Sequence, residues 1–163
     1  MHIRFITTGG TIDKIYFDAL SDYEIGESPL QGILAEGLVQ FDFDIVPLMK
    51  KDSLEMDDDD RARLRAYVED DDGSLYVITH GTDTMAETAR ALTGLAGKTI
   101  VLTGALTPAR FRTTDAVFNV GMAVAAVQVA RPGVYIAMSG QVFEASTVRK
   151  NRALNRFEIK DRS

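Results

Sequence analysis

The chain has 163 residues, 45% of them hydrophobic and 26% charged, a composition typical of one globular domain. Its net charge of −6 argues against a general affinity for nucleic acid, and no apolar run approaches the ~18 residues of a membrane span. The absence of cysteine excludes a disulfide framework and a thiolate metal site, and two histidines alone make a poor metal set. The N-terminus lacks the pattern of a signal peptide, so we expect a cytoplasmic protein.

The first half of the chain alternates apolar runs with helical patterns. The expected elements are a strand over 2–7, a helix over 29–37, a strand over 43–48 and a helix over 57–69. Residues 8–27 read as a loop that is longer than most connections, which favours a functional or mobile segment.

The second half continues the alternation. We expect a strand over 75–79, a helix over 83–96, a strand over 99–103, a helix over 114–130, a strand over 134–138 and a hairpin arm over 141–148. The helix over 114–130 carries apolar residues on most sides, which predicts that it is well buried. The domain would then span 1–148, and the basic tail over 149–163 would dock on the acidic body or on a neighbouring subunit.

This alternation predicts an α/β fold. We expect a parallel sheet of about five strands with helices on both faces, a three-layer arrangement like that of Rossmann and flavodoxin folds. Such folds bind ligands outside the carboxyl ends of their strands. Two threonine-rich glycine turns fall there, TTGGTID (7–13) and THGTDTM (79–85), as do residues 50–53 and GALTPAR (104–110).

The first turn places Thr11 on an open loop near the predicted crevice. Glycines after a strand let the backbone turn sharply and approach a ligand closely. A threonine hydroxyl becomes a nucleophile when a base takes its proton. For this motif taken alone, a turn in which threonine caps its own backbone is the simpler interpretation. The motif is not a phosphate loop, because the Gly-Lys-Ser/Thr ending is missing.

The second turn offers a hydroxyl and a carboxylate together. Thr82 and Asp83 would face the crevice, with backbone N–H groups forming an oxyanion site. Alternatively, Asp83 caps the following helix. His80 fits a structural hydrogen-bonding role better than that of a base, since no Ser-His-Asp order is evident. Lys150 is a candidate base because burial shifts lysine pKa values readily, although a solvated tail lysine is the simpler interpretation.

Taken together, TTGGTID and VITHGTDTM resemble the L-asparaginase family, the bacterial-type threonine amidohydrolases. Further similar segments follow in order along nearly the whole chain: DYEIG (22–26), KDSLEM (51–56), TGALTPAR (103–110), TDAVFN (114–119) and VFEASTVRK (142–150). The family normally has a second domain of comparable size, so the chain resembles the N-terminal domain alone, either as a naturally short form or as a fragment.

The resemblance implies a set of catalytic residues. Thr11 matches the nucleophile that attacks the side-chain amide, and Tyr23 matches the loop tyrosine that assists it. Thr82, Asp83 and Lys150 match a second hydroxyl–carboxylate–ammonium set. Which threonine acts first is open. The implied reaction converts L-asparagine and water to L-aspartate and ammonia, with no cofactor and no metal.

The resemblance also implies how substrate is held. The substrate-binding residues would be Gly10, Ser53, Thr82, Asp83 and Ala105. A homo-oligomer, dimer or tetramer, is expected, and no nucleic-acid or membrane partner. Asp13 stands where the family usually has a small residue, and Leu54 where it often has glutamine. Two alternatives therefore remain: an amidohydrolase for glutamine or an N-acyl amino acid, and a non-catalytic amino-acid-binding module.

Overall fold

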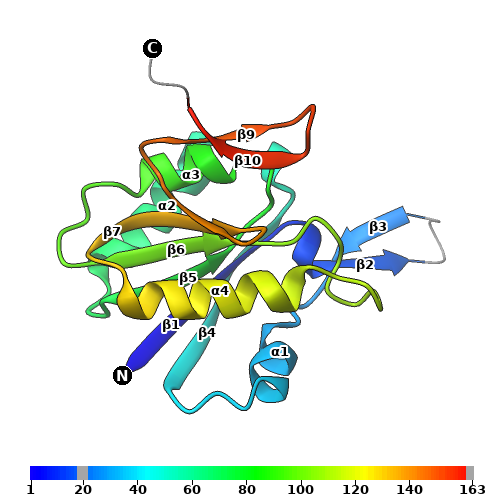
Figure 1. Ribbon diagram of the computed structural model, residues 1–163, viewed down its shortest axis with the longest axis horizontal. Coiled ribbons are helices and arrows are strands. Elements are labelled where there is room, and N and C mark those ends of the chain that lie inside the picture. The colour runs from blue at the N-terminus through cyan, green and yellow to red at the C-terminus, as the bar shows by residue number, and fades with distance from the viewer. Residues whose placement is uncertain (18–21, 161–163) are drawn as a thin grey trace.

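A six-stranded sheet separates two layers of helices (Figure 1). The structure is a computed structural model that describes residues 1–17 and 22–160. The strands of the sheet are β1 (His2–Gly9), β4 (Asp42–Lys51), β5 (Leu75–Thr79), β6 (Thr99–Thr103), β7 (Gly133–Met138) and β8 (Gln141–Glu144). The helices are α1 (Leu30–Glu36), α2 (Asp58–Asp70), α3 (Met85–Ala91) and α4 (Ala116–Val129), with single-turn helices η1 (Thr11–Asp13) and η2 (Ser53–Glu55).

The strand order is β4-β1-β5-β6-β7-β8, with β8 antiparallel to β7 and the other neighbours parallel. The parallel part has the flavodoxin-like order, in which the chain changes direction between its first and third strands. Here those neighbours are β1 and β5, with Thr7 opposite Thr79. The predicted fold class is confirmed, and both threonine-rich turns follow strands at the switch point, where such folds bind ligands.

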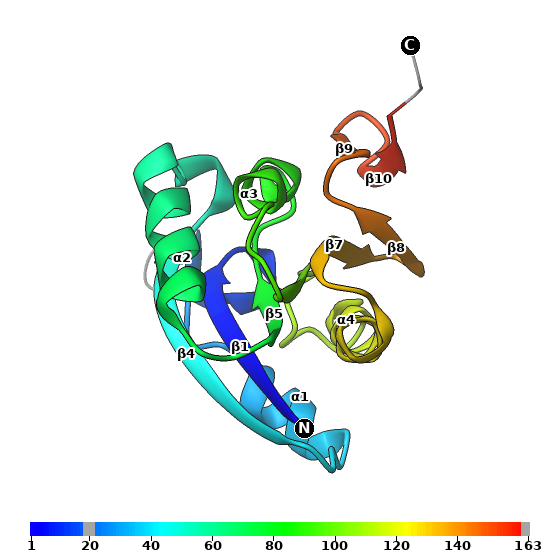
Figure 2. The ribbon, with the colours of Figure 1, turned by 90° about the vertical axis from the view of Figure 1, so that its left-hand side faces the viewer.

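Helices cover both faces of the sheet (Figure 2). One core cluster joins the sheet to α1 and α4, and another joins it to α2 and α3. Along β5, Val77 belongs to the first cluster, whereas Tyr76 and Ile78 belong to the second, as the period of two in a strand requires. Because both faces are covered, β5 and β6 read as short, almost continuous apolar runs.

The helix expected over 83–96 is shorter than predicted. It spans Met85–Ala91, and Thr84 rather than Asp83 stands at its N-cap position. The Thr84 hydroxyl donates to the Ser53 carbonyl oxygen at 2.6 Å, which holds this segment against the loop after β4. The alternative that Asp83 caps the helix is therefore wrong.

Two hairpins lie where a loop and a tail were expected. Within 8–27, β2 (Lys14–Phe17) pairs antiparallel with β3 (Asp22–Ile25). Near the C-terminus, β9 (Val148–Asn151) pairs antiparallel with β10 (Arg156–Ile159). The expected tail is thus a β-hairpin as far as Ile159, and it docks on the body of the same chain. Of the expected arm over 141–148, the first part is β8 at the edge of the sheet.

The outer side of α4 departs from the prediction that this helix is well buried. Phe118 is 61% exposed and Val129 is 84% exposed, while Val120 and Ala123 pack against the sheet. The helix contains no charged residue, and its exposed side is apolar apart from Gln128.

Docking of β9–β10 should depend on Phe157. This ring is 6% exposed and packs against Phe143 with centroids 6.4 Å apart. We expect Phe157→Ala to lower the free energy of unfolding by about 3 kcal/mol, because it removes a buried aromatic side chain. Denaturant unfolding measures this. Ile159→Ala, at a residue 62% exposed on the same strand, should change it by less than about 0.5 kcal/mol. Equal losses in the two variants would contradict the docking described.

Candidate active site

The two glycine turns meet backbone to backbone. Gly10 has φ of 87°, a conformation that favours glycine, and a Cβ placed on it would lie 2.5 Å from the Cα atom of Gly81. Thr11 and Thr82 each follow one of these glycines. The contact therefore brings the two threonine segments to one place at the carboxyl ends of β1 and β5.

The loop after β4 packs into the same junction. The Gly10 N–H donates to the Lys51 carbonyl oxygen at 3.0 Å. A Cβ on Gly81 would lie 2.5 Å from the Ser53 hydroxyl oxygen, and Ser53 is 1% exposed. Asp52 fixes the start of η2 by accepting from the Leu54 N–H at 3.1 Å. Ser53 thus lies directly beneath the second glycine turn.

The structure brings Thr82, Asp83 and Lys150 together. The Lys150 ammonium donates to the Thr82 hydroxyl oxygen at 3.3 Å and to Asn155 Oδ1 at 2.9 Å. Burial lowers the pKa of Lys150, and the nearby charge of Asp83 opposes that shift. Lys150 is therefore not the fully solvated tail lysine that the local sequence allowed.

Ala105 lies in the loop after β6, and hydrogen bonds hold the residues on both sides of it. Its side chain is fully buried. The Asp115 carboxylate accepts from the Leu106 N–H at 2.9 Å, and the Asn119 amide donates to the Gly104 carbonyl oxygen at 3.0 Å. Sequence analysis did not single out Asp115 and Asn119. The sequence feature that could have revealed them is a pair of polar residues at the start of a mostly apolar helix.

His80 uses both ring nitrogens for structural hydrogen bonds. Nδ1 lies 2.7 Å from the Gly81 carbonyl oxygen and must carry the proton there, so Nε2 accepts from the Thr88 hydroxyl at 2.8 Å. The side chain is fully buried, which lowers its pKa to about 4. His80 is therefore neutral near pH 7 and braces the second turn, as its structural interpretation expected.

Tyr23 lies on the β2–β3 hairpin. Its ring contacts Tyr16 at a centroid distance of 5.5 Å and Phe111 at 6.1 Å, which links the hairpin to the loop before α4. Together with Lys14 and Leu54, Tyr23 also lines a cavity of about 580 Å³. The action of Tyr23 on Thr11 stays a prediction.

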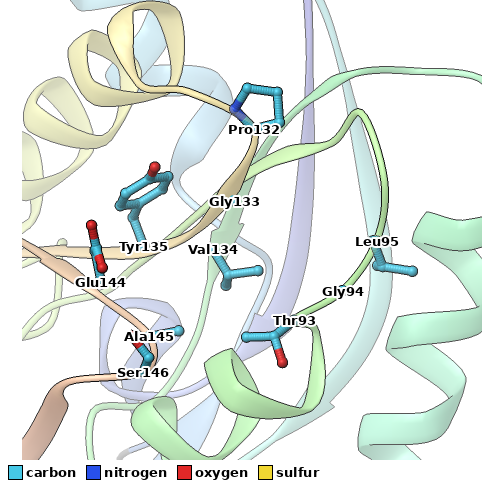
Figure 3. A pocket seen from close by; sticks show the side chains of 10 residues that line it. All are labelled: Thr93, Gly94, Leu95, Pro132, Gly133, Val134, Tyr135, Glu144, Ala145 and Ser146. Atoms are coloured by element: carbon cyan, nitrogen blue, oxygen red, sulfur yellow. The ribbon is translucent and has the colours of Figure 1, made fainter.

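Another cavity lies at the far end of the sheet (Figure 3). It has a volume of about 270 Å³ and is bordered by Gly133 at the start of β7 and Glu144 at the end of β8. None of the predicted site residues lines it. The candidate active site is therefore the carboxyl edge, where the glycine turns meet.

Comparison with known proteins decides the family. Residues 2–161 match the protein family described as "Asparaginase, N-terminal".

The chain belongs to this family.

The N-terminal asparaginase family assignment is supported by individual relatives. A probable periplasmic L-asparaginase of Haemophilus influenzae is 41% identical over 80 residues, which are 46% of this chain and 23% of that protein. L-asparaginase 2 of Escherichia coli is 39% identical over 80 residues, with the same two shares.

Solved asparaginase structures share the fold of this chain over nearly its whole length. The thermostable L-asparaginase from Thermococcus kodakarensis has a TM-score of 0.86 and 25% identity, covering 100% of this chain and 52% of that one. A probable cytoplasmic L-asparaginase from Campylobacter jejuni has a TM-score of 0.76 and 28% identity, covering 97% of this chain and 51% of that one. The chain thus spans about half the length of these asparaginases, which confirms the resemblance to the N-terminal domain.

The compartment is not decided by these relatives. One is named periplasmic and another cytoplasmic, so a cytoplasmic location stays a prediction. No helix within the described residues is both long and apolar enough to cross a bilayer.

Replacing Gly10 should disrupt the junction. Gly10→Ala adds a methyl group against the Gly81 backbone and strains a positive φ, so we expect a loss of about 3 kcal/mol in the free energy of unfolding. Gly121→Ala in α4 is the control, because open space surrounds that position and alanine favours a helix by about 0.5–1 kcal/mol. Chemical unfolding of both variants tests the contrast, which fails if Gly10→Ala unfolds like the parent.

His80 should make the chain sensitive to acid. Its pKa falls from 6.5 in the unfolded chain to about 4 in the folded one, so only the unfolded chain binds a proton between these values. Stability should be unaffected by His80 above pH 6.5 and should fall as the pH decreases toward about 4. Unfolding titrations of the parent and His80→Asn measure the difference in slope. Parallel curves would show that burial does not hold His80 neutral.

Proposed function

We propose that this chain hydrolyses the side-chain amide of L-asparagine to L-aspartate and ammonia. Membership of the asparaginase N-terminal family supports an amidohydrolase. The observation that carries the proposal is the contact of the Lys150 Nζ atom with the Thr82 hydroxyl at 3.3 Å, beside the turn that bears Thr11.

The proposed chemistry has two stages. The Thr11 oxygen attacks the amide carbon, and groups of the site transfer the hydroxyl proton to the amide nitrogen. Ammonia then departs, and an ester remains on Thr11. Water then attacks the ester, which releases aspartate and restores the hydroxyl. An acyl-enzyme replaces one difficult step by two easier ones. Backbone N–H groups of the turn at Gly81 and Thr82 would stabilise the oxyanion, an effect of roughly 100–1,000-fold per donor.

Lys150 supplies the proton acceptor in this proposal. A neutral amine at 3.3 Å from the Thr82 oxygen can accept the hydroxyl proton. The lowered pKa of Lys150 raises the fraction of neutral amine at a given pH. Asp83 limits that shift and would hold the resulting ammonium. Lys150 contacts Thr82, whose turn touches the turn that bears Thr11, and which of the two threonines acts first stays open.

Substrate would be held by groups around the junction. Ser53 and Asp83 are assigned to the α-carboxylate and α-ammonium groups and the backbone at Ala105 to the amide. Gly10 and Thr82 complete the proposed substrate-binding set. Assembly into a homodimer or homotetramer is expected as well. The uncharged, exposed side of α4 supports self-association, since exposed apolar patches mark interaction surfaces.

The test is ammonia release from L-asparagine by the purified chain. We expect Thr11→Ala and Thr82→Ala to lower kcat by at least ~100-fold, since each removes a hydroxyl that takes part in bond making or proton transfer. Thr113→Ala, at an exposed position of the loop before α4, should leave kcat unchanged. A folded parent without activity would reject the proposal, and full activity in Thr11→Ala would reject the nucleophile.

A different amide is the second candidate substrate. Leu54 is 63% exposed next to the buried Ser53, and it lines the 580 Å³ cavity with Tyr23. An apolar side chain at that place favours a substrate with more hydrocarbon than asparagine. Rates with L-glutamine and with an N-acyl amino acid, measured beside L-asparagine, separate the candidates by the ratio of their kcat/KM values.

A further inference from the structure

Asp13 is a buried carboxylate that faces a cavity. It is 3% exposed, and its Oδ1 atom accepts no hydrogen bond within residues 1–17 and 22–160. The Ser28 hydroxyl is also buried and makes no hydrogen bond of normal geometry in that part of the chain, although it lies close enough to the Asp13 carboxylate to favour its ionised form. Both residues line a cavity of about 220 Å³ between α1, β4 and the segment before α1. Unpaired buried polar groups are rare in folded proteins and call for an explanation.

The backbone holds this carboxylate in place. The Asp13 N–H donates to the Gly10 carbonyl oxygen at 3.1 Å, and its own carbonyl oxygen accepts from the Gly26 N–H at 2.8 Å. These two bonds fix the Asp13 backbone, and so they hold the base of its side chain beside the cavity. The fold therefore keeps the buried Asp13 carboxylate, whose desolvation is unfavourable, at the wall of the cavity.

The charges around the cavity do not balance. Its charged lining residues are Asp13, Glu27 and Lys50, and the last two form an ion pair with each other. With Asp13 ionised, these three side chains sum to −1. One positive charge in the cavity would neutralise the group, and a buried charge is stable only when it is paired.

We propose that this cavity binds a single ammonium group, either the free ammonium ion or the amine end of a small molecule, through Asp13 Oδ1 and the Ser28 hydroxyl oxygen. Both atoms are acceptors that suit N–H donors. Two carboxylates are too few for calcium, which takes 6–8 oxygen ligands. The cavity volume is several times the ~30 Å³ that one water molecule occupies in the liquid, so a short carbon chain also fits.

Protonation should compete with this ligand. Burial raises the pKa of Asp13 to about 6; the Ser28 hydroxyl and the Lys50 charge partly offset the rise, and the Glu27 charge adds to it. A bound cation favours the ionised carboxylate, so affinity should be higher above pH 6 and should fall as the pH drops below it.

This site goes beyond the proposed amide hydrolysis. Neither Thr11 nor any residue of the Thr82, Asp83 and Lys150 set lines the cavity. Ammonia released by the proposed reaction is one source of the ligand, but binding does not require turnover. The test therefore measures binding alone, and its result is independent of whether the chain is an asparaginase.

The experiment is thermal unfolding of the full chain at equal ionic strength in ammonium, methylammonium, potassium and tetramethylammonium chloride. At about pH 7.5 we expect Tm to rise with ammonium or methylammonium relative to tetramethylammonium, because a ligand that binds only the folded state stabilises it. The rise should shrink at about pH 5. A response to ammonium alone identifies the free ion, and a larger response to methylammonium identifies an amine head group.

Variants assign the effect to this cavity. Asp13→Asn should abolish the ammonium-dependent rise, Ser28→Ala should reduce it, and Asp42→Asn, at an exposed position, should retain it. Ser28→Ala keeps the test valid if Asp13→Asn fails to fold. An equal rise with potassium would overturn an ammonium site in favour of a general monovalent cation site. Equal Tm values in all four salts would overturn binding altogether.

Discussion

The direct contact between the backbones of Gly10 and Gly81 is the constraint on which the rest of this site depends. It lies at the switch point between β1 and β5, where strands of this topology leave room for a ligand. A side chain on Gly10 would force the two turns apart, and a side chain on Gly81 would collide with Ser53 in the loop after β4. Gly104 adds a third close approach, against the His80 carbonyl oxygen. The threonine hydroxyls are thus positioned by the absence of side chains at their neighbours.

Burial explains the shifted pKa values of three ionisable groups at one edge of the sheet. It keeps His80 neutral, favours the neutral amine of Lys150 and favours the protonated acid of Asp13. Their surroundings differ. His80 has both nitrogens occupied, Lys150 contacts a hydroxyl, and Asp13 lines a cavity. Shifted pKa values concentrate at functional sites, so this edge is where chemistry and binding are expected.

Local sequence patterns were enough for the sheet but not for the site. The strands over 75–79 and 99–103 were predicted with their observed bounds, because buried parallel strands read as short apolar runs. The start of α3 was missed because the Thr84 hydroxyl bonds to Ser53, 31 residues away. The hairpin β9–β10 was missed because its one buried aromatic ring, Phe157, stands in a basic segment. The candidate site residues were assigned through family resemblance, which carries the long-range information that periodicity lacks.

The position of Lys150 in the chain has a consequence for how the molecule is made. It reaches Thr82 across 68 residues, from a hairpin that follows all six strands of the sheet. A chain still emerging from the ribosome can pair β1, β4, β5 and β6 while its two threonine turns already touch. Until β9 folds back, however, the Thr82 hydroxyl lacks the amine of Lys150. The order of synthesis thus separates the formation of the scaffold from the completion of the candidate catalytic set.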